Sequence, residues 1–303
     1  MVASVADMKT GLVSFIGRPN AGKSTLLNRL VGTKLAIVSD KPQTTRNRIL
    51  GVKNYPDAQV VFLDTPGIHR PLHRMNVRMV DAAVDTIREV DLLGLVVDVL
   101  EPPGKGDAFV IDLVKKAKTP VILILNKIDL IRKSKLLPII DRCSQAAEFA
   151  EIVPVSAATG ENVDRLERVM IERLPEGEAL YPKDYLTDQP ERFFAAEIVR
   201  EKLLQFTHAE IPFSSAVVVD KFEEPEHPKA LMKLYCTIVV DRESQKPIVI
   251  GRGGEMIKRI GTAAREDLER FFGTRVFLDL QVKVKSEWRE DDRLLQQIGL
   301  GPK

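Results

Sequence analysis

The hydrophobic positions in the first half of the chain form short continuous runs. The runs 13–16, 60–63, 92–97 and 121–125 consist mainly of Val, Ile, Leu and Phe, and longer charged stretches separate them. A strand that is buried on both faces shows no polar alternation, and the charged stretches are long enough to hold helices. The pattern predicts an α/β domain with a mostly parallel sheet and helices on both faces.

The second half changes to amphipathic helices and alternating strands. Apolar residues recur at helical spacing over 191–206 and 255–272, so helices are expected there. Strands are expected over 214–220, 231–240 and 275–285, and in the last two every second residue is apolar and faces a core. This half is therefore predicted to form a small α+β domain.

The two halves are separated by residues that interrupt regular structure. Pro, Gly and acidic residues gather over 174–178 and again over 181–190. Such a composition is typical of a linker between domains. We expect one domain over residues 1–180, a linker over 181–190, and a second domain with a C-terminal tail over 191–303.

The apolar runs and the cysteines indicate the cellular location of the protein. No apolar run approaches the roughly 20 residues of a membrane-spanning helix, and the first residues lack the apolar segment of a signal peptide. Cys143 and Cys236 have no companions at metal-ligand spacing, which excludes a disulfide framework or a zinc site. Both thiols are expected to be buried, and the predicted location is the cytoplasm.

A glycine-rich loop follows the first predicted strand. Residues 17–24 fit the pattern G-x-x-x-x-G-K-[ST] and precede a helix-forming segment. Backbone N–H groups of such a loop surround phosphates, the Lys23 ammonium binds their outer oxygens, and the Ser24 hydroxyl ligates Mg²⁺. A glycine-rich turn without a ligand is the alternative, which the strand–loop–helix context disfavours. The candidate phosphate-binding residues are Gly17, Arg18, Pro19, Asn20, Ala21, Gly22, Lys23, Ser24 and Thr25.

The second predicted strand ends in a short acidic motif, Asp64-Thr65-Pro66-Gly67. An Asp at this place can hold a metal ion through water, and the Gly67 N–H can sense a γ-phosphate. The motif is weak alone and gains weight from its position after the phosphate loop. A polar stretch between them, residues 41–48, is either a solvated loop or a switch whose hydroxyl completes the metal shell.

The fourth predicted strand ends in residues that favour guanine. Asn126, Lys127 and Asp129 follow it, and the Asp129 carboxylate can accept from both N1–H and the amino group of guanine. Asn126 and Lys127 can brace the pocket. The turn Ser156-Ala157-Ala158 follows a later strand, and its backbone can contact the guanine oxygen.

A second glycine-rich turn, residues 251–254, precedes the predicted helix 255–272. It follows an apolar segment interpreted as a strand, and it brings backbone N–H groups, a helix dipole and cations together. KH domains clamp about four single-stranded nucleotides in this way, and the order of elements resembles the type II KH topology. Lys283, Lys285 and Trp288 either extend the basic face or are solvated. The candidate RNA-binding residues are Gly251, Arg252, Gly253, Gly254, Lys258 and Arg259.

The net charge of +2 conceals a local basic patch. The near-neutral total shows no sign of a nucleic-acid partner, and the charge of −1 over residues 181–303, taken alone, argues against RNA. Residues 242–285, however, hold 10 basic and 6 acidic side chains, a local charge of +4 around the second glycine turn. We expect RNA recognition through a small clamp and base contacts, with a shallow salt dependence.

Together these motifs resemble the Era-type GTPases of the TrmE-Era family, from about residue 9 to residue 300. The resemblance rests on residues 17–24, 43–46, 64–67, 126–129, 248–260 and 282–288. It implies an α/β P-loop GTPase domain followed by an α+β type II KH domain. It also implies GTP and GDP binding with Mg²⁺, slow hydrolysis, and binding of the 3′ end of 16S ribosomal RNA in 30S subunit maturation, linked to nucleotide state.

The same resemblance implies individual roles near the phosphates. Thr45 matches the switch Thr of related GTPases, with Thr44 as the rival assignment. Ile68 stands where Ras-like enzymes place a water-orienting Gln, and Asn20 matches relatives that use K⁺. In the second glycine turn, this sequence departs from the family, because residue 253 is Gly where many relatives carry Lys or another polar residue. The implied catalytic residues are Lys23, Thr45 and Gly67, and the implied metal ligands are Ser24, Thr45 and Asp64.

Two other classes of function compete with this reading. A metabolic or tRNA-modifying GTPase would need a nucleophile or metal cluster in its second half, where His208 and His227 are isolated in sequence. A nucleotide-gated scaffold on RNA or membrane, with little turnover, is the closer alternative. We expect a monomer that binds no DNA, and the alternative adds a peripheral contact at the inner face of the cell membrane.

Overall fold

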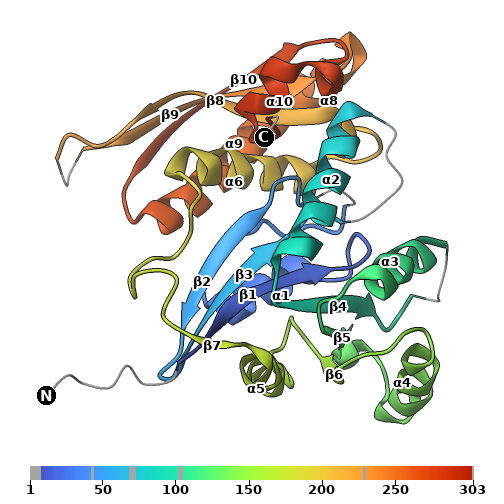
Figure 1. Cartoon of the computed structure of the whole chain (residues 1–303). Helices are drawn as coiled ribbons and strands as arrows, with labels where there is room; N and C mark the ends of the chain where they lie inside the picture. The colour runs from blue at the N-terminus through green and yellow to red at the C-terminus, as the bar shows by residue number, and fades with distance from the viewer. Residues whose placement is uncertain (1–7, 42–43, 68–72, 102–104, 228–229, 302–303) are drawn as a thin grey trace, which may run out of the picture. The chain divides into compact units, whose positions relative to one another are not determined.

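The computed structural model describes residues 8–41, 44–67, 73–101, 105–227 and 230–301 (Figure 1). The chain divides into two compact units. The first comprises residues 1–38, 45–71 and 78–188, and the second comprises 39–44, 72–77 and 189–303. Each unit has a sheet and a hydrophobic core of its own.

The first unit contains a seven-stranded sheet in the order β2-β3-β1-β4-β5-β6, with β7 paired to β1. The pairs among β3, β1, β4, β5 and β6 are parallel, and the prediction of a mostly parallel sheet is confirmed. The edge strand β2 is antiparallel and was not among the predicted strands. The bounds are β1 (Met8–Ile16), β2 (Ile49–Asn54), β3 (Ala58–Asp64), β4 (Leu92–Asp98), β5 (Val121–Asn126), β6 (Glu151–Val155) and β7 (Glu176–Gly177).

Helices cover both faces of this sheet. On one face, residues of the second, third and fourth helices join a core with Leu95 and Leu123 of the central strands. On the other face, a Cβ placed on Gly51 of β2 would meet Val31 of the first helix at 3.0 Å. The bounds are α1 (Lys23–Val31), α2 (Arg74–Glu89), α3 (Lys105–Lys116), α4 (Leu136–Ser144) and α5 (Val163–Arg173).

Much of the segment predicted to be a linker packs against the first unit. Tyr181 and Gln59 exchange two hydrogen bonds of 2.8 and 2.9 Å. The Val52 N–H of the edge strand donates to the Leu186 carbonyl at 2.8 Å. The rings of Tyr181 and Tyr185 stack at 4.7 Å and pack against the core. These contacts fix the chain along β2 up to residue 186.

The second unit contains a three-stranded sheet in the order β10-β9-β8. β8 (Ser215–Glu223) is antiparallel to β9 (Met232–Val240), and β10 (Val276–Val284) is parallel to it. Helices α6 (Glu191–Phe206) and α9 (Glu255–Phe272) occupy their predicted ranges and bury Ala195, Ile260 and Leu268 against the sheet. The short helices of this unit are α7 (Ile211–Ser214), α8 (Lys246–Ile250) and α10 (Asp292–Gln297).

The apolar segment before the second glycine turn is helical, so its interpretation as a strand was wrong. Val249 and Ile250 end α8, which has Pro247 in its first turn. Proline is favoured there because its fixed φ suits a helix start and its missing N–H is not needed. The resulting order α–β–β–α–α–β retains the expected short helix as α8.

Two expectations about single residues also change. Trp288 is completely buried, and its Nε1 donates to the Ser214 carbonyl at 2.9 Å, so it anchors the tail. Cys236 is buried as predicted, whereas Cys143 is only half-buried, which contradicts its prediction. In the described part of the chain, no helix has the length and apolar character needed to cross a membrane.

Candidate functional site

The four motifs of the first half lie together at one edge of the sheet. They follow the carboxyl ends of β1, β3, β5 and β6, which meet there because these strands are parallel. The Asn126 amide donates from Nδ2 to the Ala21 carbonyl at 2.8 Å. A Cβ on Gly67 would lie 3.1 Å from Pro19 Cα. The phosphate loop is therefore in direct contact with two of the other motifs.

The phosphate loop turns sharply into α1. Gly22 has φ of 94°, and a Cβ there would lie 2.2 Å from Asn126 Nδ2, so only glycine fits. The helix begins at Lys23, whose Nζ donates to the Gly17 and Arg18 carbonyls at 3.0 and 2.8 Å. Thr25 lies in the first turn of this helix. The loop thus combines a helix N-terminus with a cation held inside it.

Lys23 and Asp64 form the electrostatic centre of the site. Asp64 is completely buried, and this burial raises the pKa of its carboxyl group against the opposing charge of Lys23. Burial likewise lowers the pKa of Lys23 to about 8, with the Asp64 charge opposing that shift. Both groups are poorly solvated, so a charged ligand would interact strongly with them.

Two hydroxyl side chains, Ser24 and Thr45, converge on the carboxylate of this pair. Ser24 Oγ lies 2.8 Å from Asp64 Oδ2 and 2.7 Å from Thr45 Oγ1, and Thr45 Oγ1 lies 3.3 Å from the same carboxylate oxygen. Asp64 Oδ1 is buried and has no hydrogen-bond partner among the described residues. Hydroxyl and carboxylate oxygens with an unused buried lone pair are the donor set that Mg²⁺ prefers. The residues present therefore fit this ion.

The geometry distinguishes the two switch threonines. Thr45 Oγ1 lies in the oxygen cluster, whereas Thr44 Oγ1 donates to the Lys41 carbonyl at 2.6 Å. This arrangement favours Thr45 for the metal role. No cluster of three His, Cys, Asp or Glu side chains suited to a metal occurs among the residues placed by the structure. Ile68 and Gln43 lie outside the described residues.

Asn126 organises the region predicted to hold the base. Its Oδ1 accepts from the Ala157 N–H at 2.9 Å, while its Nδ2 binds the phosphate loop. Ser156 is buried, and its Oγ accepts from the Thr159 N–H at 3.1 Å. The Asp129 side chain is exposed, at the start of a short 3₁₀ helix (Ile128–Leu130). Asn126 therefore holds the phosphate loop and the Ser156 turn in a fixed relation.

Two supporting residues were missed by the sequence analysis. Lys127 Nζ pairs with Asp98 Oδ2 at 2.5 Å, and Asp98 ends β4 without any motif around it. Arg29 donates from Nε to the Ala157 carbonyl at 3.2 Å and also binds the Ala158 carbonyl. The sequence could have suggested a role for Asp98 only through the strand order. That order places β4 between β1 and β5, so the end of β4 lies beside the motif that follows β5.

The second glycine turn in the other unit exposes its middle residues. Gly251 has φ of 75°, and a Cβ there would lie 2.6 Å from Met256 Cβ, so this glycine is required by the turn. Arg252 and Gly253 are exposed, and nothing lies within 4 Å of the Cβ position of Gly253. Lys258 is also exposed. The Arg259 guanidinium instead lies 4.2 Å from the centre of the Phe206 ring, a cation–π contact.

A groove of about 350 Å³ continues from this turn along α9 and β10. Its half-buried apolar side chains look like core positions in the sequence, because they continue the alternation of β10 and the helical spacing of α9. The structure leaves them accessible between two cations, Lys258 and Arg265. The residues that line it are Ile257, Lys258, Gly261, Thr262, Arg265, Leu278 and Leu280.

Comparison with known protein families matches both halves of the chain. A family described as 50S ribosome-binding GTPase matches residues 12–127, and the KH domain family matches residues 210–289. Two relatives named GTPase Era cover nearly the whole length. The protein of Geobacter metallireducens is 50% identical over 96% of this chain and 97% of its own. That of Syntrophus aciditrophicus is 51% identical over 96% and 95%.

Two solved structures share the fold over almost the full chain. A crystal structure of Era in complex with MgGDPNP and nucleotides 1506–1542 of 16S ribosomal RNA has a TM-score of 0.93 and 42% identity. A variant of Era from Aquifex aeolicus bound to GDP and AlF₄⁻ has a TM-score of 0.92 and 42% identity. Each comparison covers 97% of this chain and 100% of the other.

Proposed function

This chain belongs to the Era family of GTPases, and we propose that it binds the 3′ end of 16S ribosomal RNA and acts in 30S subunit maturation. As a member of that family it hydrolyses GTP to GDP and phosphate, with Mg²⁺. The convergence of Ser24, Thr45 and Asp64 beside Lys23 supports the GTPase activity. The exposed glycine turn with Arg252 and Gly253 is the observation that carries the RNA proposal. The relative crystallised with MgGDPNP and 16S nucleotides supports it.

Each residue of the nucleotide site has a proposed role. Lys23 and the backbone N–H groups of residues 17–25, except Pro19, which has none, bind the phosphates. Ser24, Thr45 and Asp64 would hold the Mg²⁺, which supplies positive charge against the phosphate oxygens when bound. Asp129 accepts from guanine, and Asn126 keeps the base pocket aligned with the phosphate loop. Gly67 donates its N–H to the γ-phosphate.

We further propose that K⁺ assists hydrolysis near Asn20. The proposal rests on the resemblance of Asn20 to the relatives that use K⁺; its positive φ of 63° is a conformation that asparagine adopts more readily than most residues. Single-turnover hydrolysis in potassium and in sodium, each with and without an oligonucleotide of the 16S 3′ end, tests this idea. Faster hydrolysis in potassium is expected. Equal hydrolysis rates in the two salts would refute the role of K⁺. Negligible hydrolysis in every condition would favour the alternative of a nucleotide-gated scaffold.

RNA binding is proposed to involve the exposed glycine turn and the groove beside it. Gly251, Arg252, Gly253 and Gly254 clamp the backbone, and Lys258 supplies a cation. The half-buried Leu278 and Leu280 provide an apolar floor for bases. Arg259 contributes less than the sequence suggested, because its guanidinium already lies on Phe206.

Coupling between nucleotide and RNA is proposed to pass through one peptide bond. Thr45 belongs to the first unit and lies in the oxygen cluster. Thr44 and Arg200 both belong to the second unit, where the Arg200 guanidinium donates to the Thr44 carbonyl. A nucleotide that moves Thr45 therefore also moves the residue that Arg200 holds.

RNA affinity in the two nucleotide states tests the coupling. We expect the affinity for the 16S 3′-end oligonucleotide to differ between a non-hydrolysable GTP analogue and GDP. Equal affinities would refute the coupling while leaving GTP hydrolysis and RNA binding as separate properties.

The cellular setting stays a prediction. We propose a cytoplasmic monomer that binds RNA and no DNA. Sedimentation equilibrium tests the monomer, and competition by duplex DNA tests the preference for RNA. Co-sedimentation with anionic lipid vesicles tests peripheral contact with the inner face of the membrane.

A further inference from the structure

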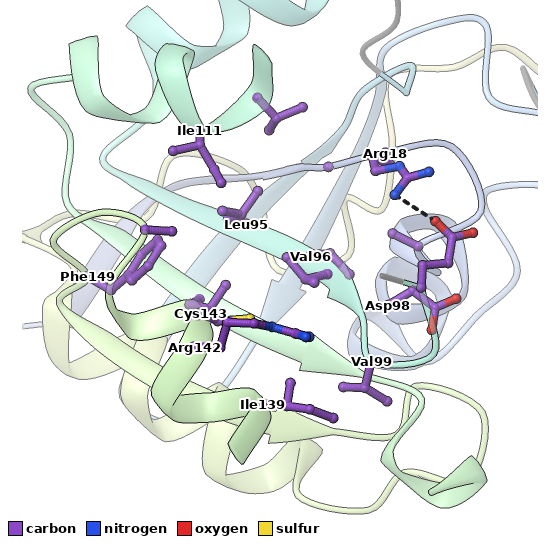
Figure 2. A pocket seen from close by; sticks show the side chains of 17 residues that line it. Arg18, Leu95, Val96, Asp98, Val99, Ile111, Ile139, Arg142, Cys143 and Phe149 are labelled. Atoms are coloured by element: carbon purple, nitrogen blue, oxygen red, sulfur yellow. Dashed lines mark ion pairs between the residues drawn. The ribbon is translucent and has the colours of Figure 1, made fainter. Parts of the chain in front are cut away.

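A cavity of about 300 Å³ lies inside the first unit, between the sheet and helices α3 and α4 (Figure 2). Its walls are mainly apolar and come from β4, β5, α3, α4 and the segment after α4. Cores are normally packed to the density of organic crystals, so a space of this size is unusual. The apolar side chains that line it include Leu95, Val97, Val110, Ile111, Ile139 and Phe149.

This cavity borders the phosphate loop but is distinct from the metal-binding and base-binding parts of the proposed nucleotide site. The lining contains none of the residues that hold the metal or contact the base. It includes Gly17 and Ala21, so the phosphate loop forms one of its walls. Gly17 lies tightly against β4, since a Cβ there would be 2.3 Å from the Val96 carbonyl oxygen. The cavity therefore lies behind the phosphate loop.

The charged groups at the cavity indicate which ligand it would take. Arg18 pairs with Glu101 at 3.0 Å, and Asp98 pairs with Lys127 at 2.5 Å. Arg142 forms no ion pair within the described ranges, and Figure 2 shows its side chain among those that line the cavity. One unpaired guanidinium beside an apolar space favours an apolar molecule with a single acidic group.

We propose that this cavity is a binding site for a small aromatic or aliphatic acid, with Arg142 holding the acidic group. The volume reaches the lower end of small-ligand pockets, which span roughly 300–1,000 Å³. Apolar cavities of even half this size bind benzene in other proteins. The ligand touches the phosphate loop through Gly17 and Ala21.

Cys143 provides a reporter for this site. Its half-buried side chain lines the cavity, and the chain has one other cysteine. Burial raises the pKa of Cys236 to about 12, so its thiol is unreactive near neutral pH. Modification of Cys143 by N-ethylmaleimide, followed by mass spectrometry, therefore measures access to the cavity, and Cys236 is the internal control.

The binding test uses two probes that differ by one acidic group. 8-Anilinonaphthalene-1-sulfonate is aromatic and anionic, and N-phenyl-1-naphthylamine has the same skeleton without the sulfonate. On the full-length protein, the sulfonate should slow Cys143 modification and bind about tenfold more tightly than the neutral amine. If saturating sulfonate left the rate of Cys143 modification unchanged, the proposed binding site would be refuted.

Variants separate the cavity from nonspecific dye binding. Arg142→Gln should abolish the preference for the sulfonate but keep binding of the amine; a retained preference would refute the role of Arg142. Ala146→Phe places a ring into the cavity and should abolish probe fluorescence, whereas Leu137→Phe on the exposed face of α4 should not. Equal binding by both Phe variants would place the probe elsewhere.

One consequence rests on the proposed nucleotide function. Because the ligand contacts the phosphate loop, it should change the GDP affinity, and GDP should change the probe affinity by the same factor. Equal GDP affinities with and without the sulfonate would refute this linkage. Protection of Cys143 by the sulfonate is measured on the protein without nucleotide, so it tests the site separately.

Discussion

Lys23 is a lysine whose protonation can change within an accessible pH range. Burial lowers its pKa from 10.5 to about 8 in the free protein. A nucleotide phosphate favours the charged ammonium, so binding restores the proton wherever the free lysine has lost it. GDP affinity is therefore expected to fall as the pH rises through about 8.

Calorimetry in buffers of different ionisation enthalpy checks this prediction. At pH 8.5 the wild-type protein should take up more protons on binding GDP through Lys23 than it does at pH 7. Lys23→Arg keeps its proton across this range and provides the control. Equal proton uptake by the two proteins at pH 8.5 would contradict the assignment.

Asp129 is predicted to set the choice of base. Asp129→Asn replaces a double acceptor by an amide, which should lower GTP affinity about a hundredfold and improve binding of xanthosine triphosphate. Competition between the two nucleotides measures the change. Asp141→Asn, on exposed α4, is the matched control. Unaltered selectivity in Asp129→Asn would remove this residue from the base pocket.

At the scale of elements, the long periodic segments were the most predictable. α9 has its predicted bounds because many residues repeat one spacing. α6 also has its predicted bounds, although it is buried on nearly all sides. β2 was missed because Gly51 interrupts its short apolar run. The packing of Leu35 and Val31 explains that glycine, because a Cβ would meet them at 2.8 and 3.0 Å. The sequence of α8 looks like a strand because it is rich in Ile and Val. It forms a helix that begins next to Pro247, a residue favoured in the first turn of a helix.

The candidate site was predictable where it depends on strand ends. The loops after β1, β3 and β5 carry recognisable patterns, and parallel pairing brings them together. The choice of Thr45 over Thr44, the pairing of Lys127 with Asp98 and the cation–π contact of Arg259 depend on tertiary packing. Adjacent threonines look alike in a sequence, so only geometry separates them.

The second glycine turn is predicted to bind RNA independently of nucleotide binding. Arg252→Asp combined with Gly253→Asp should abolish binding of the 16S 3′-end oligonucleotide and leave GDP affinity unchanged. Aspartate tolerates the positive φ of 58° at residue 253 better than most residues, and its Cβ meets nothing there. A filter-binding assay measures the loss.

The comparison for that experiment is Lys233→Asp, which reverses one positive charge, as Arg252→Asp does, at an exposed position of β9. It should leave RNA affinity within about twofold. If the double variant kept full affinity, the turn would be structural only.

For the whole molecule, charge distribution sets the response to salt. The net charge is +2, and the basic patch around the glycine turn is small. A log–log plot of RNA affinity against salt should have a slope no steeper than about −3, because few phosphates are neutralised. Titrations between low and high potassium chloride measure it. A slope near −6 would indicate a larger basic surface than the patch provides.

Arg200 is predicted to transmit nucleotide state without contacting either ligand. It is held by Glu197 through bonds of 2.6 and 2.7 Å, and it binds the Thr44 carbonyl. Arg200→Lys cannot keep this forked geometry. The difference in RNA affinity between the GTP-analogue and GDP states should shrink at least about threefold. Arg192→Lys, exposed on the same helix, should retain the full difference, and an unchanged difference in Arg200→Lys would exclude the relay.

The strip of chain that lies along β2 also protects the first unit from aggregation. An open edge strand presents unpaired N–H and carbonyl groups that recruit strands of other molecules. The Leu186 carbonyl occupies the Val52 N–H, and the Lys183 carbonyl accepts from Asn54 Nδ2 at 2.9 Å. A GTPase domain truncated after residue 180 would leave this edge strand open to pairing with other molecules, and it would aggregate. A domain that ends at residue 188 would keep the segment that covers β2 and would remain monomeric.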